Sequence, residues 1–239
     1  GTGKTIVGSA VTTGTIHTSD YGVAEPGLTR TLQNNGTIRH EGGYFNNSLT
    51  INTGGTLDNQ GTYLFIADTG INGSGGVVTN SGTFGKSGGT GASTISAAFS
   101  NNSGTLNISS GQINVSGGFN LAGAGSITGG IYQTGGSGNL SGALTGTGTV
   151  GLTGGTLTVT GTSFVPGFYQ YGGTLNGSAD LTATSGFYWA TGTMSGTGKA
   201  IVGSAVATGT IHTSDYGVAE PVLTRTLQNN GTIRHEGGY

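Results

Sequence analysis

The sequence has 239 residues and a formal net charge of −2, so it lacks the basic surface that binding to nucleic acid requires. Its 53 glycines do not follow the strict period of collagen, and the absence of cysteine excludes disulfides, thiol catalysis and cysteine-ligated metals. The longest apolar run, residues 63–67, is far too short to span a membrane, so we expect no membrane insertion of this region.

The opening stretch of the chain occurs twice. Residues 196–239 repeat residues 1–44 at an offset of 195, and 41 of the 44 aligned positions are identical. The three differing pairs are Thr5/Ala200, Thr12/Ala207 and Gly27/Val222. Near-identity of this kind is typical of tandem repeats. It predicts that residues 1–195 are one complete repeat and that residues 196–239 begin the next.

A shorter period runs inside this long one. The pattern Asn-x-Gly-Thr followed by an apolar residue begins at Asn34, Asn59, Asn80 and Asn102, with spacings of 25, 21 and 22 residues. Nine steps of about 22 residues fill the 195-residue repeat, and this is the coil length of a parallel β-helix. We expect these four asparagines to stack at one corner of successive coils as a ladder of side-chain amides.

Each step carries short segments in which apolar and polar residues alternate, such as residues 105–108, 112–115 and 156–160. This alternation is typical of strands with one buried face, and glycine and asparagine between them favour sharp corners. We find no apolar stripe with helical periodicity. The sequence therefore predicts an all-β fold, a right-handed parallel β-helix (β-solenoid) of about nine coils per repeat.

Several phrases, including residues 30–37, 57–62, 78–89 and 99–106, resemble the repeat regions of very large secreted or cell-surface bacterial proteins. These are the adhesin-like and filamentous-haemagglutinin-like β-solenoids. The resemblance covers essentially the whole chain and implies an extracellular or cell-surface location in a bacterium. It also implies a stalk, filament, sheath or adhesive shaft that associates with copies of itself, and it carries no catalytic residues.

The duplicated stretch holds every histidine, glutamate and arginine of the chain. Three interpretations of this polar concentration stay open: a solvated coil with a loop at residues 18–26, an interface between chains, or a metal site built on two histidines. Charges at an interface set register and partner choice, whereas a metal needs a third converging ligand. The candidate interface residues are His17, Asp20, Glu25, Arg39, His40 and Glu41.

Aromatic residues concentrate between positions 164 and 189. In the core they would pack against one another, and on the surface they would stack on sugar rings. Because neighbouring residues of a strand point to opposite faces, one of the three residues 187–189 should face outward. The candidate glycan-facing residues are Tyr169, Tyr171, Tyr188 and Trp189.

Polysaccharide lyases and hydrolases also use parallel β-helices, so an enzyme is a rival interpretation. Their chemistry needs clustered carboxylates, or carboxylates that hold calcium beside a base. Between residues 45 and 195 the only charged residues are Asp58, Asp68, Asp180 and Lys86. We therefore expect no catalysis and no cofactor, a structural role with the chain itself as partner, and binding of extracellular polysaccharide as the alternative.

Overall fold

The structure is a computed structural model that describes residues 3–9, 13–18, 25–42, 48–204, 207–213 and 219–237. These residues form strands and turns and contain no helix, and hence no helix that could cross a membrane. The strands are parallel and stack as a β-solenoid, as the sequence predicts. The chain divides into two compact units, residues 1–120 and 121–239, which together have about ten turns.

The first unit is built from short strands, most of them of four or five residues. They are β1 (Thr5–Val7), β2 (Gly14–His17), β3 (Gly27–Leu28), β4 (Thr31–Asn34), β5 (Thr37–Glu41), β6 (Ser48–Asn52), β7 (Thr56–Asn59), β8 (Thr62–Phe65), β9 (Gly70–Ser74), β10 (Val77–Asn80), β11 (Thr83–Lys86), β12 (Ala92–Ile95), β13 (Ala98–Asn102) and β14 (Thr105–Val115).

The second unit contains several longer, bent strands. They are β15 (Phe119–Gln133), whose first two residues belong to the first unit, β16 (Ser137–Gly146), β17 (Thr149–Leu152), β18 (Thr156–Val159), β19 (Ser163–Gly177), β20 (Leu181–Met194), β21 (Lys199–Val202), β22 (Thr208–Thr213), β23 (Val222–Leu223), β24 (Thr226–Asn229) and β25 (Thr232–Gly237).

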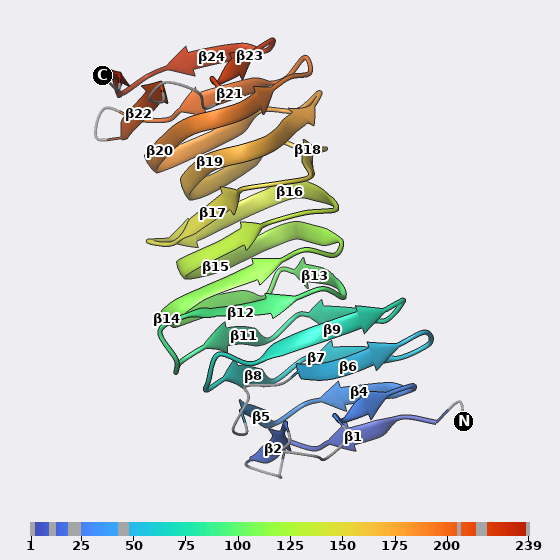
Figure 1. The fold of residues 1–239 in the computed structure, drawn as a ribbon. Coiled ribbons are helices and arrows are strands. Elements are labelled where there is room, and N and C mark those ends of the chain that lie inside the picture. The colour runs from blue at the N-terminus through green and yellow to red at the C-terminus, as the bar shows by residue number, and fades with distance from the viewer. Residues whose placement is uncertain are drawn as a thin grey trace. The chain divides into compact units, whose positions relative to one another are not determined.

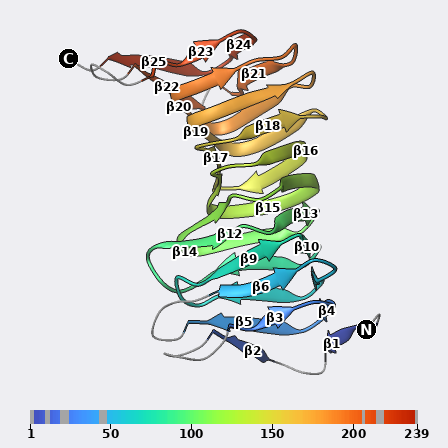
Figure 2. The same ribbon diagram turned by 45° about the vertical axis from the view of Figure 1, so that its right-hand side comes forward.

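Within each unit, a strand pairs in parallel with the strand one coil later. In the first unit β4, β7 and β10 are stacked in this way, and so are β5, β8 and β11 (Figures 1 and 2). In the second unit β17, β19, β20 and β22 continue the pattern (Figure 1). Such ladders satisfy the backbone N–H and C=O groups that one coil alone would leave unpaired.

The apolar residues of successive coils line up in columns, since strand residues alternate between inward and outward faces. In the first unit one column is Ile38, Tyr63, Phe84 and Leu106, and in the second unit one is Ile131, Val150, Phe168 and Phe187. All eight side chains are buried. The core of each unit is therefore a thin continuous stack rather than a globular centre.

Coil length varies more than the uniform period of 22 residues suggests. Paired residues lie 27 positions apart at Thr5 and Leu32, 21 apart at Leu57 and Val78, and 18 apart at Val150 and Phe168. The paired segments themselves keep a nearly constant length, because β4, β7, β10 and β17 all have four residues. Most of this variation lies in the connections, and the paired strands β19 and β20 absorb a further part through register shifts after Val165 and around Tyr171.

The segments 105–108 and 112–115, which the sequence predicts as separate strands, are the two ends of one bent strand, β14. The bend falls at Gly111, whose φ of 58° is readily available to glycine alone.

Glycine is also required where coils approach most closely. A Cβ on Gly61 would collide with the carbonyl oxygen of Gly36, so a larger residue would force these coils apart.

Aromatic side chains fill much of the core of the first unit. Tyr63 and Phe84 stack with ring centroids 4.9 Å apart and an interplanar angle of 2°. Phe65 meets both rings edge-on, and Phe99 contacts Phe84 at 5.1 Å. These offset and edge-to-face pairs add to the free energy of burial. Aromatic residues are dense in the sequence only between positions 164 and 189, so this core stack was not predicted.

Candidate functional sites

The buried corner between β4 and β5 begins a ladder of asparagine side chains. The Nδ2 group of Asn34 donates to Oδ1 of Asn59, and Asn59 donates in the same way to Asn80, both at 2.6 Å. The same amides also donate to the backbone: Asn34 to the Thr62 carbonyl and Asn59 to the Thr83 carbonyl, both at 2.8 Å. Each asparagine thus ties its own coil to the next.

The fourth member of the ladder is Asn101, and the assignment of Asn102 from the sequence pattern is wrong. Asn101 is buried, pairs with Asn80 in the strand register and accepts a 2.6 Å hydrogen bond from its Nδ2 group, whereas Asn102 is exposed. The reason is an additional residue at this corner. It is accommodated at Ser103, the only non-glycine residue with positive φ (64°) in the described part of the chain.

In the second unit, two glutamine side chains also link one coil to the next. Gln133 and Gln170 are fully buried, and their Nε2 groups donate to the carbonyls of Thr156 (2.9 Å) and Thr193 (3.2 Å), respectively, on the next coil. Leu152 lies between them in the register, so their amides do not form a continuous ladder. The glutamine side chain therefore connects neighbouring coils by donating to a backbone carbonyl, a role that the Asn-x-Gly-Thr pattern does not indicate.

The charged residues of β2 and β5 form a small exposed cluster. Glu41 lies 3.6 Å from Nε of Arg39 and 4.0 Å from Nδ1 of His17. Exposed pairs of this kind contribute little to stability, about 0–1 kcal/mol each. Glu25 is half-buried, and Asp20 lies outside the described residues. The structure thus brings three of the six candidate interface residues together.

His40 does not belong to this surface, and its assignment as an interface residue is wrong for the first copy. Alternation along β5 places it on the inward face with Ile38, and it is fully buried. Its Nδ1 atom lies 2.7 Å from the Tyr63 hydroxyl, while Nε2 has no hydrogen-bond partner. Burial lowers the pKa of His40 from 6.5 to about 4, so the ring is neutral near pH 7.

The two histidines of the metal interpretation do not converge on one site. His17 pairs with Glu41 in the register, one position beyond His40, so the two histidines lie on opposite faces of adjacent strands. Among the described residues no three His, Cys, Asp or Glu side chains are grouped closely enough to hold a metal ion.

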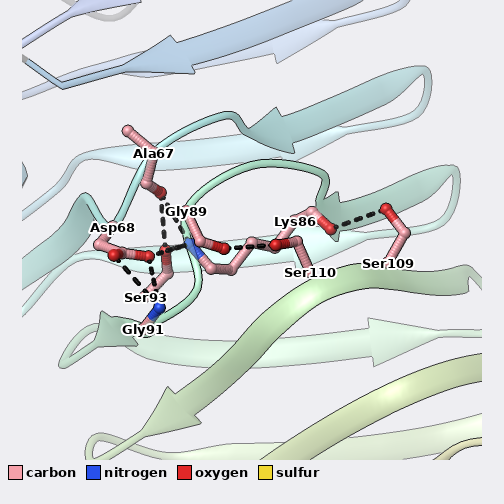
Figure 3. A network of polar contacts seen from close by, with 8 residues as sticks. All are labelled: Ala67, Asp68, Lys86, Gly89, Gly91, Ser93, Ser109 and Ser110. Carbon is pink, nitrogen blue, oxygen red and sulfur yellow. Dashed lines mark hydrogen bonds and ion pairs between the residues drawn. The ribbon is translucent and has the colours of Figure 1, made fainter.

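The buried ion pair of the first unit is a different kind of site (Figure 3). Lys86 ends β11 and is fully buried, and its Nζ group donates to Asp68 at 2.7 Å, to the Ala67 carbonyl at 2.9 Å and to the Ser93 hydroxyl at 3.2 Å. Asp68 also accepts the backbone N–H of Gly91. The hydrogen bond from Lys86 lowers the pKa of Asp68, so the carboxylate stays ionised.

The other two carboxylates of the enzyme interpretation also have local partners. Asp58 accepts from Gln60 at 2.8 Å and from the Thr79 hydroxyl at 3.2 Å, and Asp180 accepts the backbone N–H of Lys199 at 2.7 Å. These bonds link neighbouring coils or brace a turn. The hydrogen bonds of Asp58 and Asp180 can therefore hold neighbouring coils in register.

Tyrosine side chains form a column on the outer face of the second unit. Tyr132, Gly151, Tyr169 and Tyr188 occupy equivalent positions of successive coils. The column is continuous because Gly151 leaves room for the Tyr132 ring, which an added Cβ would strike. Tyr171 joins it, with its ring 5.1 Å from Tyr188 and 6.5 Å from Tyr169.

The column includes three of the four candidate glycan-facing residues. Trp189 is excluded from it: this side chain is 2% exposed, and its indole N–H donates to the Thr191 carbonyl at 3.1 Å. Phe187 and Trp189 share the inward face, so Tyr188 is the outward residue that strand alternation requires. Tyr132 was not predicted, because it lies well before the aromatic-rich stretch of the sequence.

A shallow groove of about 250 Å³ runs beside this column. Its lining includes Tyr169 and the hydroxyl-bearing residues Thr147, Thr149, Ser185 and Thr208. An aromatic ring flanked by hydroxyl groups can stack on one face of a sugar and hydrogen-bond its edge.

No protein-family model, curated protein or solved structure matches this chain.

Proposed function

We propose that this protein is a structural repeat of a long extracellular bacterial filament, sheath or adhesin shaft, without catalytic activity. The observation that supports this most directly is the asparagine ladder. Asn34, Asn59, Asn80 and Asn101 repeat one contact with one geometry, coil after coil. A structure held in this way extends by repetition of the same unit.

The surface supports the same function. Few side chains are charged, so little charge repulsion opposes the lateral packing of neighbouring rods. Coils stacked about 4.8 Å apart make a stiff rod. The bacterial and extracellular assignment rests on the resemblance of the repeat phrases to those of secreted β-solenoids.

Electron microscopy of the purified protein over a range of concentrations tests this function. We expect thin rods of uniform width whose length grows with concentration, because axial association adds coils without changing the cross-section. Isolated particles of constant size at every concentration would argue against a filament.

The tyrosine column supports a second candidate, binding of an extracellular polysaccharide. Tyr169, Tyr171 and Tyr188 present rings on one face beside a groove lined with hydroxyl groups. Stacked tyrosines bind sugar faces without a charged group, as a neutral polysaccharide requires. The chain would then act as an adhesive shaft.

Co-sedimentation with insoluble cellulose and chitin tests this second candidate. The Tyr169→Ala/Tyr188→Ala variant should lose binding by at least tenfold. Phe164→Ala is the control, because Phe164 is an exposed aromatic residue (43%) that lies outside the column. If both variants sediment like the unchanged protein, the column does not bind these polymers.

A further inference from the structure

Three tyrosine rings lie in contact on the outer face of the second unit. The rings of Tyr171 and Tyr188 have centroids 5.1 Å apart and an interplanar angle of 36°, and those of Tyr169 and Tyr188 have centroids 6.0 Å apart at 56°. Both distances fall in the range of about 4.5–7 Å at which aromatic rings pack against each other. The imidazole ring of His212 stacks on Tyr188 with an interplanar angle of 19°. Tyr188 is therefore held between rings from the coil before it and the coil after it.

The backbone register keeps Tyr171 on the surface beside Tyr188. The strands β19 and β20 pair on adjacent coils, and their register shifts by one residue between Gln170 and Tyr171, so that Tyr171 pairs with Thr191. Without this shift Tyr171 would pair with Ala190, which is buried. Instead, Tyr171 is 44% exposed. A reagent in solution can thus reach one ring of the pair directly.

We propose that Tyr171 and Tyr188 form a cross-linking site, where a peroxidase that consumes hydrogen peroxide joins the two rings by a carbon–carbon bond. Each phenol gives up one electron and one proton and becomes a phenoxyl radical. The two radicals couple at ring carbons next to their oxygens, and the hydrogen atom on each joined carbon moves to the oxygen and restores a phenol. The two electrons and two protons that are released reduce one hydrogen peroxide to two waters, and the product is a dityrosine bond.

The position of the two phenols favours coupling within one chain. Groups that are held in contact react as if they were highly concentrated, so coupling within the pair should exceed coupling between chains in dilute solution. Burial and the charges of neighbouring phenols raise the pKa of Tyr171. Its hydroxyl therefore keeps its proton near pH 7 and releases it to water when the ring is oxidised.

The other tyrosines of the column are less suited to this coupling. Tyr169 is farther from Tyr188 and more steeply inclined to it, and its ring lies 6.5 Å from that of Tyr171 at 78°. Tyr132 is separated from Tyr169 by the coil of Gly151. The pair of Tyr171 and Tyr188 thus combines the shortest of these ring distances with direct exposure.

A bond between these two rings would tie neighbouring coils together covalently. Tyr171 and Tyr188 are 17 positions apart, so the bond would close a short loop and restrict the unfolded chain, as a disulfide does. The chain has no cysteine with which to form a disulfide. The coupled protein should therefore unfold at a higher urea concentration than the uncoupled protein, whether or not chains assemble into filaments.

The single aspartate between the two tyrosines allows the bond to be detected. Cleavage before each aspartate separates residues 68–179 from residues 180–214, and the second fragment contains Tyr188 as its only tyrosine. The test oxidises dilute protein with a peroxidase and hydrogen peroxide, isolates single chains under denaturing conditions and then cleaves them. We expect the two fragments to stay joined, with a mass two hydrogen atoms below the sum of the separate fragments.

Phenylalanine variants keep the rings but remove the reactive phenols. Tyr171→Phe should give at least tenfold less of the joined fragments. Tyr132→Phe is the matched control, because it removes another phenol of the same column, and it should join like the unchanged protein. In urea that unfolds the chain, Y171F and the unchanged protein should give similar yields. Equal joining of Y171F and the unchanged protein in the folded state, or no joining of either, would overturn the site, whereas filament formation is measured separately.

Discussion

Lys86 Nζ lies 2.7 Å from Asp68 Oδ1, and only the aspartate of this pair reaches solvent, with 32% of its side chain exposed. The two residues are 18 positions apart and come from adjacent coils. The buried ammonium group therefore depends on protein acceptors alone, whereas the carboxylate retains water as an alternative. Because of this difference in exposure, the protein should tolerate the loss of Lys86 better than the loss of Asp68.

Removal of Asp68 should cost more than removal of Lys86. Asp68→Ala leaves a buried charge without its counter-ion, and we expect it to lower the free energy of unfolding by about 3–5 kcal/mol. Lys86→Met keeps an apolar side chain in the same space and should cost about 1 kcal/mol. Urea denaturation measures both. The double variant should resemble K86M, and a K86M cost equal to that of D68A would contradict this account.

The neighbouring residues Asn101 and Asn102 provide a direct test of the ladder. Asn101→Ala removes the acceptor for Asn80 and the donor to the Gly104 carbonyl, so it should destabilise the protein by about 1–3 kcal/mol. Asn102→Ala changes an exposed side chain and should stay within about 0.5 kcal/mol of the unchanged protein. Thermal and urea unfolding should agree. A larger effect of N102A would restore the register predicted from the sequence.

His40 should make the protein sensitive to mild acid. Its pKa is about 4 in the folded state and 6.5 when unfolded, so the unfolded chain binds the proton first as pH falls. Stability is full above pH 6.5 and decreases towards pH 4, by about 3 kcal/mol at 1.36 kcal/mol per pH unit. Asp68 loses its contribution only below this range, because Lys86 lowers its pKa from 3.8.

Urea unfolding at a series of pH values from 7 to 4 measures this effect. His40→Phe removes the titrating group but keeps a ring in the aromatic core, so its stability should vary much less over this range. His235→Phe changes the exposed equivalent in the second copy and is the matched control. An unchanged pH profile in H40F would show that another group causes the acid sensitivity.

Ser103 should be replaceable with a gain in stability. Its φ of 64° is unfavourable for a residue with a Cβ but not for glycine. We expect Ser103→Gly to raise the free energy of unfolding by about 0.5–1 kcal/mol, part of the relief being offset by the greater freedom of glycine in the unfolded chain. Ser109→Gly, within β14, should destabilise instead. A destabilising S103G would indicate that the serine side chain supports this corner.

The sequence predicted the solenoid because its signal repeats. The spacing of Asn34, Asn59 and Asn80 marks one corner three times, and the alternation in β18 marks a strand with one buried face. The coil length was less accessible, since connections absorb insertions that no pattern marks. The additional residue at the Ser103 corner is such an insertion, and it led to the wrong assignment of Asn102. Asn101 and Asn102 are adjacent, and only the strand register shows that Asn101 belongs to the ladder.

The errors at the candidate sites have a shared physical origin. Residue type suggested a surface role for His40 and Trp189, but the alternation of each strand placed them inside. His40 lies two residues after Ile38, so the inward face of β5 could have been assigned from the sequence. Tyr132 could not have been assigned, because its place in the tyrosine column depends on the register between coils.

Fibre diffraction from aligned, concentrated protein tests directly whether chains associate axially by stacking their coils. If chains associate axially by stacking coils, the pattern should show a sharp meridional reflection at about 4.8 Å, the spacing of paired strands along the fibre axis. A 4.8 Å reflection on the equator, or none in ordered fibres, would contradict axial coil stacking.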